Sequence, residues 1–287
     1  MRLTHVGFVL KPHTPQAAQV ADRLATALKR QGVGSLSLGG EGRPRPTKAK
    51  VVSAAVFREK AELAIVIGGD GTFLGAAHVL YGCPMPLIGV NLGRVGFLTE
   101  VDADKAAGVV TALMEGTLDV ERRPYFLATV RRGRTLLMEE PFVNDVVLQR
   151  DAADKMISYA LSVGGQPMSV TRADGLIVST PTGSTAYNLS NGGPIVAPGL
   201  EGLVLAPICP HRLSFRPVVV PPAPVELTLH TAHGHLSADG RDLVNLNAGD
   251  VVTITRSPHM LYLMHDPARN FFDVLRAKLG WDTPIEK

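Results

Sequence analysis

Apolar and polar positions follow different patterns in the two parts of the chain. In the first part, continuous apolar runs at residues 6–10, 63–67 and 86–90 alternate with segments of helical spacing at residues 15–30, 73–81 and 103–114. Continuous apolar strands separated by helices are typical of a parallel sheet that is covered on both faces. We therefore expect an α/β domain over residues 1–121.

From about residue 122 the pattern changes to short strand-like runs. These runs lie at residues 125–130, 142–149, 157–163, 175–179, 218–220, 225–230 and 251–256. Turn formers separate them, among them Gly133 and the pairs Gly164–Gly165 and Pro221–Pro222. This pattern predicts a β-rich, sandwich-like second domain over residues 122–265.

The last stretch returns to helical spacing. Apolar residues lie on one face of a helix over residues 270–279, namely Phe271, Val274, Leu275 and Leu279. An amphipathic helix needs a partner for its apolar face. We therefore expect the segment of residues 266–287 to pack back on the first domain.

Composition and charge narrow the class of protein. The 287 residues suit one large or two medium domains, and 45 % hydrophobic with 19 % charged residues is typical of a globular protein. A net charge of +3 fits an anionic ligand, but together with 5 % aromatic residues it disfavours nucleic-acid binding. The one basic cluster lies among Pro and Gly and is interpreted as a solvated loop; it comprises Arg43, Arg45, Lys48 and Lys50.

Cysteine content and hydropathy indicate a cytoplasmic protein. Cys83 and Cys209 lie far apart in the sequence and are interpreted as reduced, partly buried thiols, although one disulfide would be available to them. The apolar segment at residues 6–10 is too short for the core of a signal peptide. No run approaches the roughly 20 apolar residues of a membrane span, so no membrane partner is expected.

The sharpest motif lies between a predicted strand and a predicted helix, and consists of Gly68, Gly69, Asp70, Gly71 and Thr72. Ligands bind at the carboxyl ends of strands in open α/β sheets, where glycines let backbone amides approach phosphate oxygens. The carboxylate could accept a proton, hold a hydroxyl or help to hold a metal ion; a tight turn with a helix cap is the alternative. Neither the dinucleotide fingerprint nor the Walker loop is present here, which disfavours a standard dehydrogenase and a P-loop kinase.

Two further motifs lie in the β-rich part. Residues 180–187 read Thr-Pro-Thr-Gly-Ser-Thr-Ala-Tyr, in which small hydroxyl side chains and the stacking face of Tyr187 suit a nucleoside; a polar turn is the alternative. Asn144 and Asp145 interrupt the apolar run at residues 142–149, where polar groups are costly unless partnered. They could bind a base edge or ribose hydroxyls, or lie at a strand start or bulge. Asp239–Gly240 is interpreted as a hairpin turn with a secondary contact role left open.

Together these motifs resemble those of the NAD kinase family. Residues 68–72 match its glycine-aspartate motif, and residues 91–98, Asn-Leu-Gly-Arg-Val-Gly-Phe-Leu, resemble its next conserved loop. Asn144–Asp145 resembles its Asn-carboxylate pair, and residues 180–187 match its Thr-Pro-Thr-Gly-Ser-Thr-Ala-Tyr segment in full. The glycine-aspartate motif also occurs in lipid kinases and in relatives of phosphofructokinase, so the segment at residues 180–187 is the more specific marker.

The resemblance implies a two-domain enzyme that forms NADP, with its active site between the domains. It would transfer a phosphoryl group from ATP, or from inorganic polyphosphate, to the 2′-hydroxyl of the adenosine ribose of NAD. Asp70 is the implied catalytic residue, with phosphate binding at Gly68, Gly69, Gly71 and Thr72, Mg²⁺ as the expected divalent cation, and a homodimer or homotetramer as the expected assembly. The implied NAD-binding residues are Asp70, Gly71, Phe97, Asn144, Asp145, Asp174, Thr182, Thr185, Ala186, Tyr187 and Ser190.

Some alternatives stay open at this point. The family pair is most often Asn-Glu, and Asp145 reaches one methylene less far. An ordinary carboxylate is a weak base for a sugar hydroxyl, so Asp70 could instead orient the hydroxyl or bind the metal. A lipid kinase would need an apolar groove and a membrane-facing surface, for which the sequence shows no basic amphipathic helix. A non-catalytic NAD-binding sensor would keep residues 180–187 and would not require Asp70.

Overall fold

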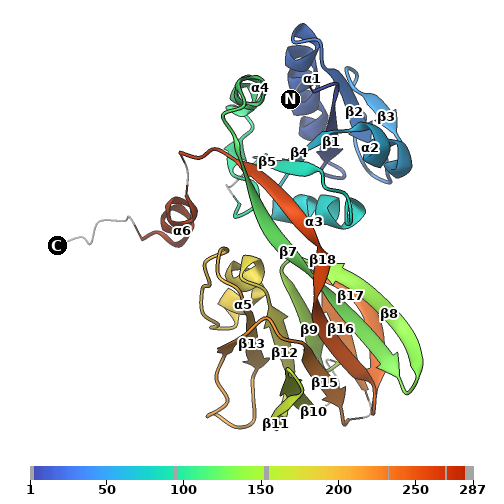
Figure 1. The fold of residues 1–287 in the computed structure, drawn as a ribbon, viewed down its shortest axis with the longest axis vertical. Helices are drawn as coiled ribbons and strands as arrows, with labels where there is room; N and C mark the ends of the chain where they lie inside the picture. The colour runs from blue at the N-terminus through green and yellow to red at the C-terminus, as the bar shows by residue number, and fades with distance from the viewer. Residues whose placement is uncertain (1–2, 94–95, 152–154, 232, 269, 282–287) are drawn as a thin grey trace, which may run out of the picture. The chain divides into compact units, whose positions relative to one another are not determined.

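The computed structural model describes residues 3–93, 96–151, 155–231, 233–268 and 270–281. It divides into two compact units (Figure 1): Met1–Arg122 with Leu261–Lys287, and Arg123–Met260. The first unit is an α/β structure with a parallel sheet, and the second is an antiparallel β-sandwich. Both parts of the predicted fold class are confirmed.

The sheet of the first unit is built from five main strands in parallel. They are β1 (His5–Leu10), β2 (Gly34–Leu38), β3 (Lys50–Val52), β4 (Leu63–Gly68) and β5 (Pro86–Asn91), in the order β3-β2-β1-β4-β5. The short strand β6 (Val101–Asp102) and the end of β18 (Val251–His265) also pair with β5. All six residues of β4 are buried, as the continuous apolar run predicts for a central strand.

Helices lie against both faces of this sheet (Figure 1). They are α1 (Pro15–Arg30), α2 (Ala54–Lys60), α3 (Asp70–Val79) and α4 (Ala106–Glu115). Val20, Leu24 and Leu28 recur at helical spacing and share one core with alternate residues of β1, β4 and β5 and with α4. The opposite face of β1 lies against α2, where Gly7 packs on the ring of Phe57.

Two predicted helices begin elsewhere than expected. α3 begins at Asp70, three residues before the predicted start, because Gly69 is its extended N-cap and an acidic residue is favourable in a first turn. α4 begins at Ala106, after a turn in which the Lys105 N–H donates to the Asp102 carbonyl at 2.9 Å. The elements β2, β3 and α2 were not predicted.

The second unit has two antiparallel sheets. In the first, β11 (Gln166–Ala173), β10 (Ile157–Val163), β15 (Val225–Leu229) and β18 lie side by side, and β7 (Asp119–Arg132) pairs with β18 and β8 (Thr135–Phe142). The second has the order β14 (Val218–Val220), β13 (Leu203–Ile208), β12 (Gly175–Ser179), β9 (Asp145–Gln149), β16 (His233–Ala238) and β17 (Arg241–Asn247).

Strand alternation places the core of the sandwich between these sheets. Leu148 and Leu176 of the second sheet meet Phe126 and Tyr159 of the first in one buried cluster. The intervening residues of the second sheet, such as Ile177, point to its outer face, where they form a smaller apolar cluster. This outer face carries the motif at residues 180–187, because Val196, which follows that motif, packs on the same cluster.

Three local predictions are wrong. The predicted single strand over residues 142–149 is two strands, because β8 ends at Phe142 and β9 begins at Asp145. The basic cluster is not wholly a solvated loop: Lys50 begins β3, and Arg43 donates to the Leu10 carbonyl at 3.0 Å, with a pKa lowered by burial. Cys209 is exposed rather than partly buried, whereas Cys83 is half-buried, and both are free thiols.

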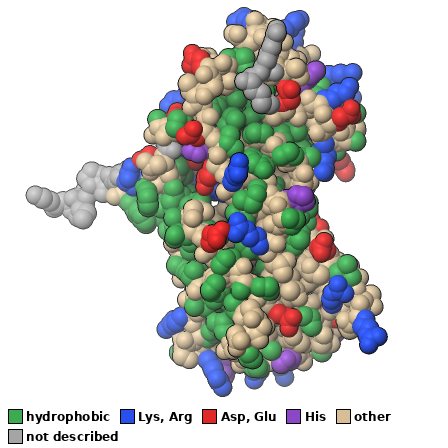
Figure 2. Space-filling view, viewed as in Figure 1, with side chains coloured by type: hydrophobic (Ala, Val, Ile, Leu, Met, Phe, Trp, Pro, Cys, Tyr) green, Lys and Arg blue, Asp and Glu red, His purple; other side chains and the backbone are tan. Residues whose placement is uncertain are grey.

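The distribution of surface charge and the length of the helices can be compared with the expectation that neither nucleic acid nor a membrane is a partner. On the face drawn in Figure 2, Lys and Arg side chains are spread among other types rather than gathered in one patch. Within the part of the chain that the structure describes, no helix is both long and apolar enough to cross a bilayer.

The close approach at Gly7 generates a prediction for stability. A Cβ at this position would overlap the ring of Phe57, which is 0 % exposed. We expect Gly7→Ala to lower the free energy of unfolding by about 1–3 kcal/mol, as overpacking does. The matched control is Gly108→Ala in α4, where no atom in the described part of the chain lies within 4 Å of the added Cβ. Denaturant unfolding followed by circular dichroism measures both; equal stability of the two variants would contradict the assigned packing.

Candidate functional site

The glycine-aspartate motif forms the junction between β4 and α3. Gly69 is the N-cap of the helix, and its carbonyl accepts the N–H groups of Thr72 and Phe73 at 2.9 and 3.0 Å. The first N–H groups of a helix have no acceptor within the helix, and the helix dipole adds positive potential there. This end of α3 is therefore suited to phosphate oxygens, as the sequence motif predicts.

The glycines of this motif serve different purposes. A Cβ at Gly68 would overlap the side chain of Thr72, so Gly68 is required by the packing of the protein itself. At Gly69 and Gly71 no atom of the described residues lies within 4 Å of an added Cβ, and neither residue has a positive φ. The packing of that part of the chain therefore does not require glycine at these two positions. The open space around them is what a close approach of phosphate to the backbone would use.

The carboxylate of Asp70 holds the segment that follows β5. Its Oδ2 accepts the N–H of Phe97 at 2.9 Å, and its Oδ1 accepts the Leu98 N–H at 3.1 Å and the Thr99 hydroxyl at 3.0 Å. A Cβ at Gly96 would overlap the carboxylate, so glycine there permits this approach. A carboxylate offers about four lone-pair positions, so one remains for a substrate hydroxyl.

This structural role of Asp70 was missed at the level of sequence, and so was Thr99. The loop motif at residues 91–98 contained the two backbone donors, Phe97 and Leu98, but nothing in the sequence linked them to Asp70. Phe97 is also contacted by the C-terminal helix α6 (Phe271–Leu279): Lys278 Nζ lies 5.8 Å from the centre of its ring. Arg94 and Val95 of the predicted loop lie outside the described residues.

In the second unit, the segment at residues 180–187 is held on the outer face of the second sheet. It forms the 3₁₀ helix η1 (Thr182–Thr185) and enters the short helix α5 (Tyr187–Ser190). The Thr180 hydroxyl donates to the Val143 carbonyl at 2.6 Å, and Ser184 Oγ accepts the N–H of Val196 at 2.9 Å. Two of the four Thr and Ser hydroxyls of this motif therefore hold the chain itself, so fewer face outward than its composition suggested.

The outward-facing residues of this segment are those at its end. Thr182 is 8 % exposed and Thr185 and Ala186 are half-buried, whereas Ser190 is exposed and Tyr187 is 41 % exposed. The Tyr187 hydroxyl accepts a hydrogen bond from Gln149 Nε2 at 3.1 Å. This bond fixes the polar tip of the ring and leaves its face available for stacking. Gln149 was not predicted; as a polar residue ending an apolar strand, it offered only a weak signal.

Asp174 lies between β11 and β12, directly before Gly175, and is half-buried. Its carboxylate forms an ion pair with Arg150, with Nε and Oδ1 2.7 Å apart. The backbone carbonyl of Asp174 also accepts the Arg150 N–H at 2.9 Å. The predicted NAD-binding carboxylate is thus positioned by an arginine that the sequence analysis did not single out.

A second carboxylate explains why the predicted strand is broken at Asn144. Asp239 lies in the β16–β17 turn with Gly240, and both have positive φ, which confirms the predicted hairpin. Its carboxylate accepts the N–H groups of Val143, Asn144 and Asp145 at 2.8, 2.7 and 3.2 Å. Asn144 is half-buried at this bend, and its buried Oδ1 has no hydrogen-bond partner among the residues that the structure describes.

Asp145 occupies an environment unlike that of the other predicted site residues. It is 5 % exposed at the start of β9. Burial raises the pKa of Asp145 to about 7, and the nearby Asp239 charge acts in the same direction. Asp145 therefore holds its proton to a much higher pH than an exposed aspartate does.

The chain matches two family models that together span most of its length. The ATP-NAD kinase N-terminal domain matches residues 6–118, and the ATP-NAD kinase C-terminal domain matches residues 143–265. Among curated relatives, the NAD kinase of Magnetococcus marinus is 37 % identical over 285 residues, covering 97 % of this chain and 94 % of the relative. That of Geobacter metallireducens is 36 % identical over 287 residues, covering 96 % and 98 %.

Solved structures share the fold. An NAD kinase from Archaeoglobus fulgidus in complex with ATP has a TM-score of 0.74 and 28 % identity, covering 96 % of this chain and 98 % of its own. Yeast NADH kinase complexed with NADH has a TM-score of 0.86 over 99 % of this chain and 89 % of its own. At 23 % identity, the latter likeness concerns the fold alone.

The environment of Asp145 predicts a pH-dependent stability. With a pKa raised from 3.8 to about 7, the folded protein keeps a proton that the unfolded chain releases. Stability should therefore fall as pH rises from about 4 to 7, by at most about 1.4 kcal/mol per pH unit, and this contribution levels off above pH 7. Asp145→Asn should flatten that decline, whereas the exposed control Asp104→Asn should not. Unfolding free energies across this range test it, and an unchanged slope in Asp145→Asn would contradict it.

Proposed function

This chain belongs to the NAD kinase family, and we propose that it transfers the terminal phosphoryl group of ATP to the 2′-hydroxyl of the adenosine ribose of NAD, forming NADP. The observation that carries the proposal is the Asp70 carboxylate, which lies at the start of α3 between two glycines with open space around them. The ATP complex of the Archaeoglobus fulgidus relative supports ATP as the donor.

The junction between β4 and α3 would bind the phosphate groups. Phosphoryl transfer depends mainly on positioning and on stabilising charge, so fixed backbone amides are well suited to it. Gly69 and Gly71 would admit phosphate oxygens to the backbone. Gly68 and Thr72 would contribute to phosphate binding by holding the backbone of this junction in place, since Gly68 packs directly against the Thr72 side chain.

Three of the lone-pair positions of the Asp70 carboxylate accept hydrogen bonds from residues 97–99. Asp70 would act on the substrate hydroxyl with the remaining position. Accepting a hydrogen bond from the ribose 2′-hydroxyl would orient that oxygen, and taking its proton would make it a better nucleophile. The three hydrogen bonds onto the carboxylate support either role, because they hold both of its oxygens in fixed positions.

The residues at this junction fit a divalent cation that arrives with ATP. Mg²⁺ is usually held by one or two carboxylates together with substrate phosphates and waters. Asp70 is the one carboxylate among residues 68–72 and would be its protein ligand, in which case its one free lone-pair position would bind the cation instead of the substrate hydroxyl. When bound, the cation would neutralise negative charge on the donor phosphates.

The second unit would bind the dinucleotide. Tyr187 would stack on a base, because Gln149 holds its hydroxyl while its ring is exposed. Asn144 would offer its buried Oδ1 to a polar group of NAD. Asp145 is nearly fully buried and would offer only the edge of its carboxyl group. The remaining contacts are assigned to Asp174, Thr182, Thr185, Ala186 and Ser190 of this unit, and to Phe97 of the first unit.

Other expectations from the sequence stay predictions. They are inorganic polyphosphate as a second donor, a homodimeric or homotetrameric assembly, and a cytoplasmic location. The domain limits at residues 121 and 265 likewise stay predictions.

The catalytic proposal predicts the behaviour of Asp70→Asn. With NAD, Mg²⁺ and ATP, we expect NADP formation to fall by about 10²–10⁴-fold, as the loss of a general base does. Thr99→Val removes one hydrogen bond from the same carboxylate and should cost far less. A coupled assay with an NADP-specific dehydrogenase measures both, with polyphosphate in a parallel reaction.

Other outcomes of this experiment point elsewhere. NAD binding by calorimetry without NADP from either donor in the unaltered protein would support a non-catalytic sensor. Absence of NAD binding would support a lipid kinase. If a large excess of Mg²⁺ restored turnover to Asp70→Asn, the base role would be wrong and the metal role supported.

The glycines of α3 offer a matched test of phosphate binding. Gly71→Ala and Gly75→Ala each add one methyl group to the same helix in open space, so neither should destabilise the fold. We expect Gly71→Ala to raise the KM for ATP about tenfold, equivalent to about 1.4 kcal/mol, because its Cβ enters the space used by phosphate. Gly75→Ala should leave KM unchanged; equal KM values for the two variants would refute phosphate contact at Gly71.

A further inference from the structure

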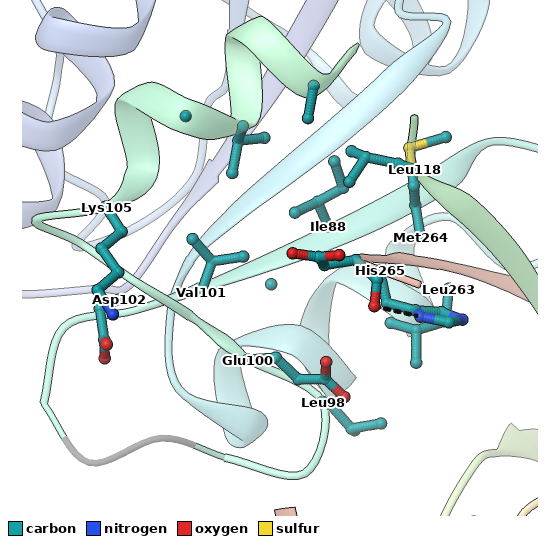
Figure 3. Close-up of a pocket in the computed structure, with 15 residues that line it drawn as sticks. Ile88, Leu98, Glu100, Val101, Asp102, Lys105, Leu118, Leu263, Met264 and His265 are labelled. Carbon is teal, nitrogen blue, oxygen red and sulfur yellow. Dashed lines mark hydrogen bonds between the residues drawn. The ribbon is translucent and has the colours of Figure 1, made fainter. Parts of the chain in front are cut away.

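A cavity of about 360 Å³ lies within the first unit, apart from the residues assigned above (Figure 3). Its walls come from β5, the segment of residues 98–102, α4 and the end of β18, together with the flanking residues Lys105, Leu118 and Asp266. Figure 3 shows Ile88, Val101 and Leu118 directed toward the same space from different parts of the chain. Its volume falls within the roughly 300–1,000 Å³ typical of small-molecule sites.

The lining of this cavity divides into an apolar part and an acidic part. The apolar part consists of Ile88, Leu98, Val101, Val109, Ala112, Leu118, Leu263 and Met264. Three carboxylates, those of Glu100, Asp102 and Asp266, also line it, against one lysine, Lys105, and one histidine, His265. An occupant would therefore place hydrocarbon against the apolar wall and positive charge near the carboxylates.

The spacing of these groups favours an organic cation over a metal ion. Throughout the described ranges, no three His, Cys, Asp or Glu side chains converge closely enough to hold one ion. The three carboxylates of this cavity therefore do not form one metal-binding cluster. An organic amine can pair with one of these carboxylates and place its hydrocarbon on the apolar wall, whereas a metal ion needs several ligands at one point.

The cavity shares a residue with the segment that Asp70 holds. The side chain of Leu98 lines the cavity, and its backbone N–H donates to Asp70 Oδ1 at 3.1 Å. The wall residue Gly89 packs so closely on the Leu98 carbonyl that it has no room for a Cβ. An occupant that pushes on Leu98 therefore acts on the hydrogen bonds that position the Asp70 carboxylate.

We propose that this cavity is a regulatory site for a small organic cation with a hydrocarbon body, and that occupancy changes the rate of NADP formation through Leu98 and Asp70. The site differs in place and in ligand charge from the proposed binding of NAD and ATP, which are both anionic. The binding measurements that test this site do not depend on the proposed reaction, since ligand binding is measured without turnover.

The test uses the full chain and two probes of matched size and opposite charge, 2-phenylethylamine and phenylacetate. Calorimetry should show saturable binding of the amine and at least tenfold weaker binding of the acid. Gly108→Leu adds a side chain at a wall residue where, among the described residues, no atom lies within 4 Å of an added Cβ. This variant should weaken amine binding at least tenfold. Thr111→Leu on the exposed side of the same helix is the matched control and should bind as the unaltered protein does.

The charge of the site is tested by the double variant Glu100→Gln with Asp266→Asn. It should bind the amine at least tenfold more weakly than the unaltered protein, while circular dichroism shows an intact fold.

The regulatory coupling is tested by activity. Saturating amine should change the rate of NADP formation at least twofold in the unaltered protein and not in Gly108→Leu. No amine binding, equal binding of both probes, or undiminished binding by Gly108→Leu would overturn the site. Amine binding without any change in rate would overturn the regulatory coupling.

Discussion

The first unit depends on one constraint: a carboxylate at the start of α3 is shared with the chain that leaves β5. Three donors from residues 97–99 converge on Asp70, and they can do so only because Gly96 and Gly89 allow close approach of the backbone. The start of α3, the position of the loop after β5 and the candidate catalytic carboxylate therefore depend on one another. A substitution at any of these positions changes the geometry of the others, so the loss of activity in an Asp70 variant has to be compared with that in a Thr99 variant.

The second unit uses a carboxylate in the same way. Asp239, in a hairpin turn, accepts three consecutive backbone N–H groups and thereby breaks what would have been one long strand at Asn144. The break provides acceptors for Thr180, whose hydroxyl and N–H bond the Val143 and Asn144 carbonyls. Gly183 then approaches the Asn144 backbone so closely that a Cβ would overlap it. Candidate NAD-binding groups are thus placed by backbone contacts among three distant segments.

Both arrangements suit phosphoryl transfer, which relies on fixed donors and acceptors more than on covalent chemistry. Buried and paired polar groups move little, so a substrate would meet groups that are already in position. Few groups remain available to a substrate: about one lone-pair position on Asp70, the Oδ1 of Asn144, which has no partner among the described residues, and one exposed face of Tyr187. Such a site would recognise its substrate specifically through these few groups.

Sequence alone determined the features that arise from local patterns. The bounds of α1 were predicted fully, because Pro15 begins it and apolar residues recur at helical spacing. β10 and β12 were likewise predicted, as short β-rich runs between turn formers. The motifs also led to the family, since glycines, hydroxyls and Asp70 at fixed spacing carry chemistry without reference to contacts.

Tertiary structure decided what depends on contacts between distant residues. No local pattern indicates that Asp239 would break the strand at Asn144, that Thr99 would bond Asp70, or that Gln149 would hold Tyr187, since each pair is separated by tens of residues in the chain. The buried state of Asp145 and its raised pKa follow from the same cause. Local sequence specifies turns, periodicity and chemical groups, whereas burial and hydrogen-bond partners exist only once strands far apart in the chain are paired.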